Sequence, residues 1–492
     1  MAAIITEKFR IHNAKQFKED FGESASSSYI FIGRSFDWTD ENNPPAPANA
    51  VGEEIDSYAD MIAMKKVSTS DVSHGLTRYD WTSGTSYDEY SHDYSATNTS
   101  PASTSNNLYD SRFFVITDEY NVYKCIRTGR DSSGAVVVSD VKPTGTSATT
   151  LITTADSNAA SGRGYVWKYM YTISASETIK FVTNDFIPVK TIGAVASVDG
   201  TGSGGAIGSS ASDDGTGQWD VENSAVDGGI HHVSVTAGGS GYTDGTYPNV
   251  AIVGDGSGAT CSVIVSSGAV VHVDITAAGS GYKRASINVD GISSIGSGSG
   301  GIVKPIISPF YGHGADPVQE LGGNFVCVNA RLEFAEGAGD FPIDNDFRRI
   351  GLIQDPFTVG TTTVATATSL AAYSQMTLSS VTGLAVDNLI MSATADGTGV
   401  AVSRVVSISG LVVSHVPVAN SAGGYVDFTS SDSVYVGGSS VGNVNSVNGT
   451  FPEVERYSGQ IMYVENIRKI KPIPSNYIKR MMFVGICLNA VL

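Results

Sequence analysis

The sequence predicts a mainly β protein of the α+β class, with a β-sandwich-like body, a few short helices and two inserted all-β modules. Three observations lead to this fold class. Glycine accounts for 55 of the 492 residues, well above the roughly 7% of an average protein. Charged residues make up only 16% of the chain, and this low content excludes helical coiled coils. Hydrophobic residues reach 41%, which provides enough material for buried cores and argues against a disordered chain.

Two short helices are expected near the N-terminus. Ala14, Phe17 and Phe21 recur at spacings of three and four residues, which places an apolar stripe on one face of a helix. Ser57 and Asp60 form a capping-box pattern ahead of further apolar residues. We therefore expect the second helix to begin near position 57 and to run for two or three turns.

Strands dominate the rest of the first 190 residues. β-Branched and aromatic runs at 113–116, 122–126 and 165–173 are bounded by Gly, Asp and Asn, a pattern typical of β-strands. The segment 82–107 is rich in Tyr, Ser and Asp, and its length is that of a functional or mobile loop.

An internal repeat marks the next part of the chain. The sequence from His232 to Tyr242 recurs from His272 to Tyr282, and each copy is an alternating strand followed by a Gly-Ser-Gly-Tyr turn. A second strand after each copy makes the unit a short β-meander, as in repeat or prism-like modules. We expect both tyrosines to cover the ends of strand pairs, and the alternative is that they form a binding face.

Composition divides the chain into a body and two insertions. The body comprises residues 1–190, 304–356 and 456–492, whereas residues 191–303 form a Gly/Ser-rich β-repeat module and residues 357–455 a small β-sandwich or barrel. The two insertions are acidic, with ten acidic against two basic residues in the first and six against one in the second.

The charge of the chain limits its partners. The formal net charge is −19, and an acidic surface repels nucleic-acid phosphates and anionic lipid. Charged residues stand where a signal peptide needs an apolar run, and no stretch approaches the ~20 apolar residues of a membrane span. We expect no nucleic-acid partner, no membrane association, and synthesis and assembly in a cytoplasm.

No motif predicts catalysis, a cofactor or a metal site. Residues 200–205 match the letters GxGxxG, but the residues after them are unsuited to the helix that a dinucleotide site requires. His231, His232 and His272 come nearest to a metal cluster, yet the last two share one repeat position and are better explained as solvent-facing strand residues. Residues 344–346 begin like a calcium loop but lack its glycine and glutamate.

The last stretch, residues 456–492, is basic within an acidic chain. It holds six Lys or Arg residues against a single acid, Glu465. We expect it to pair with acidic surface on its own body or on a neighbouring protein, with Arg468, Lys469 and Lys471 as the candidate assembly contacts.

Several motifs follow one another along the body segments. They are Thr6-Glu7-Lys8-Phe9-Arg10, Ile32-Gly33-Arg34-Ser35-Phe36-Asp37-Trp38, Arg78-Tyr79-Asp80-Trp81, Val122-Tyr123-Lys124-Cys125-Ile126, Gly164-Tyr165-Val166-Trp167-Lys168-Tyr169, Thr183-Asn184-Asp185-Phe186-Ile187, Phe347-Arg348-Arg349-Ile350 and Ser458-Gly459-Gln460-Ile461-Met462-Tyr463-Val464-Glu465-Asn466. With these motifs in this order, the body resembles the baseplate wedge subunit family known as gene product eight in T-even-like contractile-tailed bacteriophages.

The resemblance implies a structural, non-enzymatic, homodimeric subunit of a phage tail baseplate wedge. Such a subunit binds other wedge proteins, is assembled in the bacterial host cytoplasm and contributes to baseplate assembly and the host attachment machinery. The motif residues expected to be structural or interface residues are Arg34, Trp38, Trp81, Trp167, Arg348, Tyr463 and Asn466. For the tryptophans and Arg34, roles in the core and in ion pairs are favoured over direct partner contacts.

Two other functions compete with this interpretation. The first is a receptor- or polysaccharide-binding tail protein, in which the Gly-Ser-Gly-Tyr repeats form the adhesive face and the insertions contact the host surface. The second is a depolymerase, for which the sequence supplies no catalytic signature.

Overall fold

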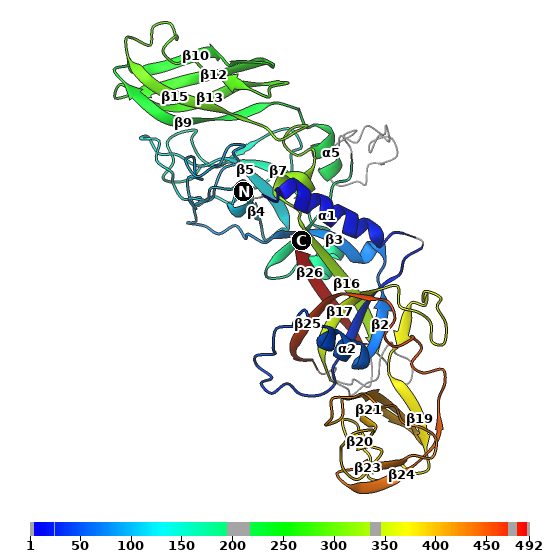
Figure 1. Cartoon of the computed structure of the whole chain (residues 1–492). Coiled ribbons are helices and arrows are strands. Elements are labelled where there is room, and N and C mark those ends of the chain that lie inside the picture. Colours follow the sequence, from blue (N-terminus) through cyan, green and yellow to red (C-terminus); the bar gives the residue numbers. More distant parts are fainter. Residues whose placement is uncertain (1–3, 24, 194–216, 335–345, 471–479, 490–492) are drawn as a thin grey trace. The chain divides into compact units, whose positions relative to one another are not determined.

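The chain forms two compact units, each of which contains part of the body and one of the insertions. The computed structural model describes residues 4–23, 25–193, 217–334, 346–470 and 480–489. Unit 1 comprises Met1–Lys15, Ser73–Val326 and Asn489–Leu492, and unit 2 comprises Gln16–Val72 and Cys327–Leu488. Antiparallel sheets and a six-stranded barrel make up most of the structure, so the mainly β prediction is confirmed (Figure 1).

The first predicted helix is present as α1 (Glu7–Asp20). It buries Ile11 and Ala14, and Phe17 meets Phe21 edge to face with ring centroids 5.3 Å apart. Among the described residues, no helix is long and apolar enough to cross a membrane.

The body part of unit 1 is built on an antiparallel sheet with the strand order β4-β5-β7-β6. Its strands are β4 (Phe114–Ile116), β5 (Asn121–Arg127), β6 (Ile152–Thr153) and β7 (Val166–Thr172), which confirm the three predicted aromatic strands. The elements around it are β3 (Val72–Thr77), η2 (Leu108–Asp110), α3 (Ala175–Phe181), β8 (Phe186–Val189), α5 (Gly217–Asn223) and α6 (Pro317–Leu321). The helix α5 buries Val221 in one core cluster with Trp167 of β7.

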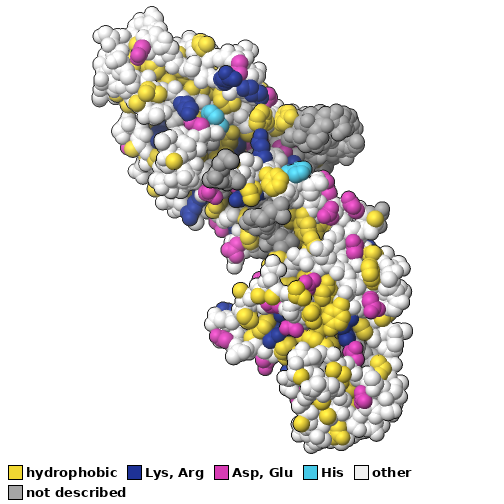
Figure 2. Space-filling view, in the orientation of Figure 1, with side chains coloured by type: hydrophobic (Ala, Val, Ile, Leu, Met, Phe, Trp, Pro, Cys, Tyr) yellow, Lys and Arg dark blue, Asp and Glu magenta, His cyan; other side chains and the backbone are white. Residues whose placement is uncertain are grey.

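The repeat forms a β-module with its own hydrophobic core. Its strands are β9 (Ile230–Ser240), β10 (Gly245–Ala251), β11 (Val253–Gly254), β12 (Ser257–Ser266), β13 (Ala269–Ser280), β14 (Ala285–Ser286) and β15 (Ser299–Ile307). They pair in the orders β10-β12-β13, β15-β9 and β11-β14. Figure 2 shows few charged side chains on the visible face of this β9–β15 module.

The two repeat tyrosines are buried in this core. Tyr242 and Tyr282 are 4% and 1% exposed. The Tyr242 hydroxyl accepts from the Gly301 N–H at 2.8 Å, and the Tyr282 hydroxyl donates to the Ile252 carbonyl at 3.1 Å. Both tyrosines therefore cover neighbouring strands, as expected.

The tyrosine rings also explain two of the glycines in the module. A Cβ at Gly298 would lie 2.4 Å from the Tyr242 ring, and one at Gly256 would lie 2.5 Å from the Tyr282 ring. Because such distances are far inside van der Waals contact, both positions require glycine.

The expectation that His232 and His272 face solvent is wrong. Their side chains are buried, and each bonds to a charged group of unit 1. Strand alternation correctly puts the two residues in equivalent positions, but the face to which they point is covered by the body of the unit.

Unit 2 is centred on a five-stranded antiparallel sheet with the order β18-β2-β1-β17-β25. Its strands are β1 (Ser28–Gly33), β2 (Met61–Lys66), β17 (Phe347–Gln354), β18 (Ser369–Ala371) and β25 (Gln460–Ile470). Three more elements of the chain are η1 (Thr69–Asp71), β16 (Phe325–Phe334) and β26 (Arg480–Asn489). The central strand β1 is buried along its whole length.

The predicted start of the second helix is wrong. The helix α2 spans Val51–Ala59, and the chain enters β2 at Met61. The Ser57 hydroxyl does not cap a helix but donates to the Glu53 carbonyl at 2.8 Å. Met61 and Met64 are completely or almost completely buried in the sheet core, so burial on the sheet outweighs the local helix signal.

The second insertion contains a closed barrel with the order β19-β22-β21-β20-β23-β24. Its strands are β19 (Ser374–Leu378), β20 (Leu389–Met391), β21 (Val402–Ser409), β22 (Val412–Pro417), β23 (Ser433–Val436) and β24 (Ser439–Val447). Leu370 and Val454, which flank the barrel in sequence, pack in one cluster with Tyr29 and Phe31 of the body sheet. The barrel is therefore shorter than the 357–455 segment that composition marks out.

Candidate assembly site

Motif segments that are far apart in sequence meet at the N-terminal end of β17 in unit 2. Arg348 and Arg349 lie on β17, and Asn466 lies opposite Arg349 on β25. The segment after β1, which carries Arg34 and Trp38, joins the same site through the contacts described next. The structure thus brings together six of the residues that the sequence singled out separately, namely Arg34, Trp38, Arg348, Asn466, Arg468 and Lys469.

Arg348 is the centre of a buried charge network. Its side chain is fully buried, and its Nε donates to Glu41 Oε1 at 2.7 Å while Nη1 donates to the Ser35 carbonyl at 2.9 Å. Nη2 donates to Asp37 and, at 3.3 Å, to Asp346 Oδ2. Burial of a guanidinium is costly unless it is paired and hydrogen-bonded, and here every nitrogen has a partner.

Arg349 extends the network towards α2. Its Nη1 lies 3.0 Å from Asp60 Oδ2, and both side chains are almost fully buried. Its Nε donates to Asn466 Oδ1 at 3.0 Å. Burial raises the pKa of Asp60 to about 7, and the positive charges of Arg349 and Arg34 oppose this rise.

Arg34 and Trp38 form a stacked arrangement beside this network. The Arg34 guanidinium carbon lies 3.6 Å from the Trp38 ring centroid and 4.0 Å from that of Phe36, within the range of a cation–π contact. The Trp38 Nε1 donates to the Ile467 carbonyl at 3.0 Å. These contacts hold the segment after β1 against β25.

The basic residues of β25 take part in the same arrangement. Lys469 Nζ lies 2.6 Å from Asp346 Oδ2, and Arg468 Nε donates to the Asn42 carbonyl at 3.0 Å. The hydrogen bond to Asp346 raises the pKa of Lys469. Lys471, the third basic candidate, lies outside the described residues.

The remaining motif residues lie elsewhere. Tyr463 is on β25, where its hydroxyl donates to Glu465 at 3.0 Å. Trp81 and Trp167 belong to a core cluster of unit 1. Trp167 is fully buried and stacked on Tyr165, whereas the Trp81 Nε1 donates to Ser139 at 3.1 Å.

The sequence did not predict a second group of buried charges, in unit 1. Lys124 of β5 is fully buried, with its Nζ 2.8 Å from Glu320 Oε2 and 2.9 Å from His313 Nδ1. The Nζ also lies 4.0 Å from the Tyr90 ring centroid. The only signal in the sequence is a lysine inside the apolar run at 122–126.

Charged pairs also join the β9–β15 module to the body of unit 1. His232 Nε2 lies 3.1 Å from Glu89 Oε1, and Arg127 Nη1 lies 3.1 Å from His272 Nε2 and 3.2 Å from Asp274 Oδ1. Burial by itself would raise the pKa of Glu89, but the charge and hydrogen bond of His232 lower this pKa well below its usual range.

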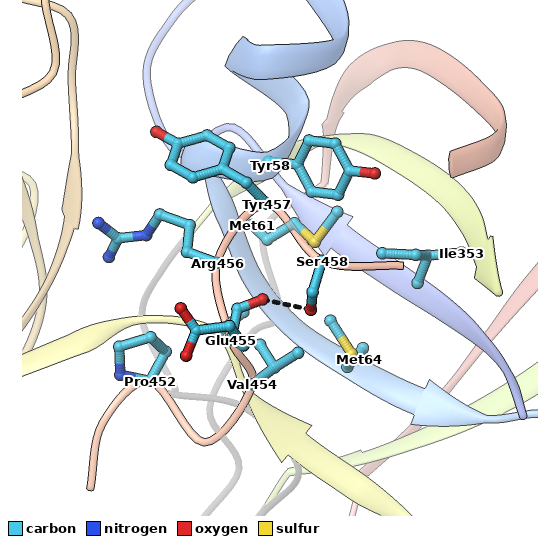
Figure 3. Close-up of a pocket in the computed structure, with 11 residues that line it drawn as sticks. Tyr58, Met61, Met64, Ile353, Pro452, Val454, Glu455, Arg456, Tyr457 and Ser458 are labelled. Carbon is cyan, nitrogen blue, oxygen red and sulfur yellow. Dashed lines mark hydrogen bonds between the residues drawn. The ribbon is translucent and has the colours of Figure 1, made fainter. Parts of the chain in front are cut away.

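A small hollow lies beside α2 in unit 2 (Figure 3). Its volume is about 10 Å³, and its walls include Tyr58, Met61, Met64 and Tyr457. The Ser458 hydroxyl at this site donates to the Glu455 carbonyl at 2.5 Å. Ligand pockets of ~300–1,000 Å³ are larger and have convergent polar groups, so the hollow does not indicate a ligand.

No metal-binding group is found among the residues that the structure describes. Within them, no three His, Cys, Asp or Glu side chains are placed to hold an ion. The glycine motif at 200–205 and residues 344 and 345 of the acidic motif lie outside the described part of the chain.

Comparison with known proteins identifies a family for the N-terminal part of the chain. The model of the Phage-Gp8 family, described as Bacteriophage T4, Gp8, matches residues 3–197. No curated protein matches the chain. The matched residues include Arg34, Trp38, Trp81 and Trp167, whereas the β9–β15 module and the barrel lie beyond them. Over residues 3–197, about two fifths of its 492 residues, the chain is therefore similar to the Gp8 family of bacteriophage T4.

Proposed function

We propose that the protein acts as a homodimer that joins other wedge proteins during baseplate assembly and so contributes to the host attachment machinery. The family match over residues 3–197 is the observation that carries this proposal. The buried charge network supports it, because ion pairs that are fully hydrogen-bonded hold a framework rigid, as a structural subunit requires.

The exposed end of the network is the proposed contact with neighbouring wedge proteins. Asp37 is 78% exposed and Lys469 is 45% exposed, although both are tied to buried groups. Such exposed charges on a rigid base favour complementary charges on a partner and increase the rate of association.

The burial of Tyr242 and Tyr282 argues against the polysaccharide-binding alternative. A tyrosine that stacks on a sugar must expose its ring, but the two repeat tyrosines are 4% and 1% exposed. The Gly-Ser-Gly-Tyr turns therefore offer no aromatic adhesive face through these residues.

Two measurements test the proposal. Light scattering of the purified protein should give twice the mass of one chain, and electron microscopy of intact tails that carry a labelled copy should place the label at the inner wedge. A monomer at micromolar concentration would contradict the dimer, and a label at the fibre tips would favour a receptor-binding protein.

A further inference from the structure

An exposed proline-rich segment lies between β1 and α2, in the loop that follows the central strand of the unit 2 sheet (Figure 1). Pro44, Pro45 and Pro47 occur within four residues. Pro44 is half-buried, whereas residues 45–50 are exposed without interruption. Residues 44–48 form neither a helix nor a strand nor a turn.

The sequence restricts the backbone of this segment to an extended form. Proline fixes its own φ near −65°. The residue before a proline is excluded from the α region and adopts β or polyproline II geometry, a restriction that applies here to Asn43, Pro44 and Ala46. These restrictions favour a short polyproline II stretch with the spacing Pro-x-x-Pro.

The buried network fixes the position of this stretch. The Asn466 side chain donates to the Pro45 carbonyl at 3.1 Å, and Arg468 donates to the Asn42 carbonyl at 3.0 Å. On the other side, the Ala48 N–H donates to Glu53 at 2.6 Å. Because these bonds use backbone groups, the proline rings themselves are not needed to hold the loop.

We propose that residues 44–47 dock into a groove lined by aromatic side chains on another baseplate protein, an inference that rests on the proposed wedge function. Proline rings pack against aromatic rings, and a polyproline II stretch binds such grooves with little loss of conformational entropy because it is already ordered. A prolyl nitrogen donates no hydrogen bond, so the partner supplies the donors, from Trp, Tyr or Asn side chains.

A different protein fits this segment better than a second copy of the chain. Among the residues that the structure describes, the large aromatic side chains with marked exposure are Phe9, Tyr120, Phe310 and Tyr457. Tyr457 packs against Tyr58 with ring centroids 5.9 Å apart, but the hollow beside these two rings has a volume of only about 10 Å³, too small for a proline ring. A groove for Pro-x-x-Pro needs several aromatic rings side by side.

The test is a variant in which Pro44, Pro45 and Pro47 are all replaced by Ala. Co-expression with the other baseplate proteins of the same phage should give at least about 10-fold less of this variant in purified wedges, as expected when a central anchor is removed. The melting temperature should stay close to that of the unmodified protein, because the anchoring bonds are kept. Pro248→Ala, at an exposed proline of β10, is the matched control and should be incorporated normally.

A crosslink identifies the protein that binds the segment. A photoreactive benzoylphenylalanine at position 46, irradiated in assembled wedges, should couple to a peptide that lines an aromatic groove of one other wedge protein. Normal incorporation of the triple variant, crosslinks to a second copy of this chain, or crosslinks to no wedge protein would each overturn the inference. If the unmodified protein enters no wedge particle at all, the proposed function fails and the inference fails with it.

Discussion

Glu89 and His232 lie 3.1 Å apart at the junction between the body of unit 1 and the β9–β15 module, and both side chains are buried. The Glu89 carboxylate also accepts from the Thr128 N–H at 3.0 Å and from Arg130 at 3.3 Å. The histidine of the first repeat thus completes the hydrogen bonding of a buried carboxylate of the body.

Replacement of this histidine should destabilise the protein. His232→Ala removes one donor from buried Glu89, and a buried group that loses a partner costs about 1–3 kcal/mol. We expect a lower free energy of unfolding in urea, whereas His12→Ala, at an exposed position of α1, should have little effect. Equal stability of the two variants would show that the Glu89–His232 contact does not hold the module in place.

Stability should fall as the pH is lowered below 7. Burial lowers the pKa of His415 in the barrel to about 4. In the unfolded chain this histidine has a pKa near ~6.5, so it takes up a proton at a higher pH than it does in the folded chain. The free energy of unfolding therefore decreases as the pH falls from about 6.5 to 4. For this single group the loss amounts to about 3 kcal/mol.

The variant His415→Leu isolates this effect, because it removes the titrating group. Urea unfolding at pH 7 and at pH 4.5 should show a smaller loss of stability in the variant than in the wild type. Parallel pH profiles of the two proteins would mean that His415 does not carry the effect.

Loss of Arg348 should be among the most damaging single changes in unit 2. Arg348→Leu removes the guanidinium from Glu41 and from Asp346, which is 4% exposed and keeps its contact with Lys469, and a buried group that loses a hydrogen-bond partner costs about 1–3 kcal/mol. Arg78→Leu breaks a pair with Asp80, which is 54% exposed, and should cost less than about 1 kcal/mol. Thermal melting of the two variants checks this order, and a mild effect at Arg348 would contradict the assigned network.

The basic residues of β25 should influence assembly more than folding. Arg468→Gln, Lys469→Gln and Lys471→Gln together should slow wedge assembly, most strongly at low salt, where charges are least screened. In the ion pair between Lys469 and Asp346, the lysine side chain is 45% exposed. The loss of this pair should therefore lower the stability of the protein only slightly. Lys8→Gln with Arg284→Gln removes exposed charge elsewhere as a control. Assembly rates in the triple variant that match the wild type at every salt concentration would dismiss these contacts.

The β9–β15 module should be removable without unfolding the rest of unit 1. Ser234 and Lys304 are register partners on β9 and β15, so a short Gly/Ser linker can replace residues 235–303. This cut keeps α5, whose Val221 is buried in the body core, and it keeps His232. Arg127 loses His272 and Asp274 but retains hydrogen bonds to the Gly162 and Gly164 carbonyls. We expect a soluble protein with cooperative melting, and an insoluble or molten product would show that the module supplies part of the main core.

The sequence predicts those features that depend on neighbouring residues. The strands at β4, β5 and β7 follow from aromatic and β-branched runs, and the module follows from its repeat. The start of α2 was not predictable, because Met61 and Met64 join the sheet only when β1 and β18 lie beside β2.

The site depends on pairings that no local pattern contains. Arg348 meets Glu41 and Ser35 because β1 pairs with β17, from Ser28 opposite Gln354 to Gly33 opposite Arg349. His232 and His272 were correctly predicted to occupy equivalent strand positions, but only the packing of the module on the body shows that these positions are buried. The motifs of the family resemblance therefore singled out residues without showing which of them meet.

The register between β9 and β15 also bears on how such a chain changes over generations. Because the chain enters and leaves the module through adjacent partners of one strand pair, a recombination event between these two positions would exchange the whole module and leave the strand ends in place. Such a cassette can therefore be acquired, lost or replaced in a single genetic step while the rest of unit 1 is inherited unchanged.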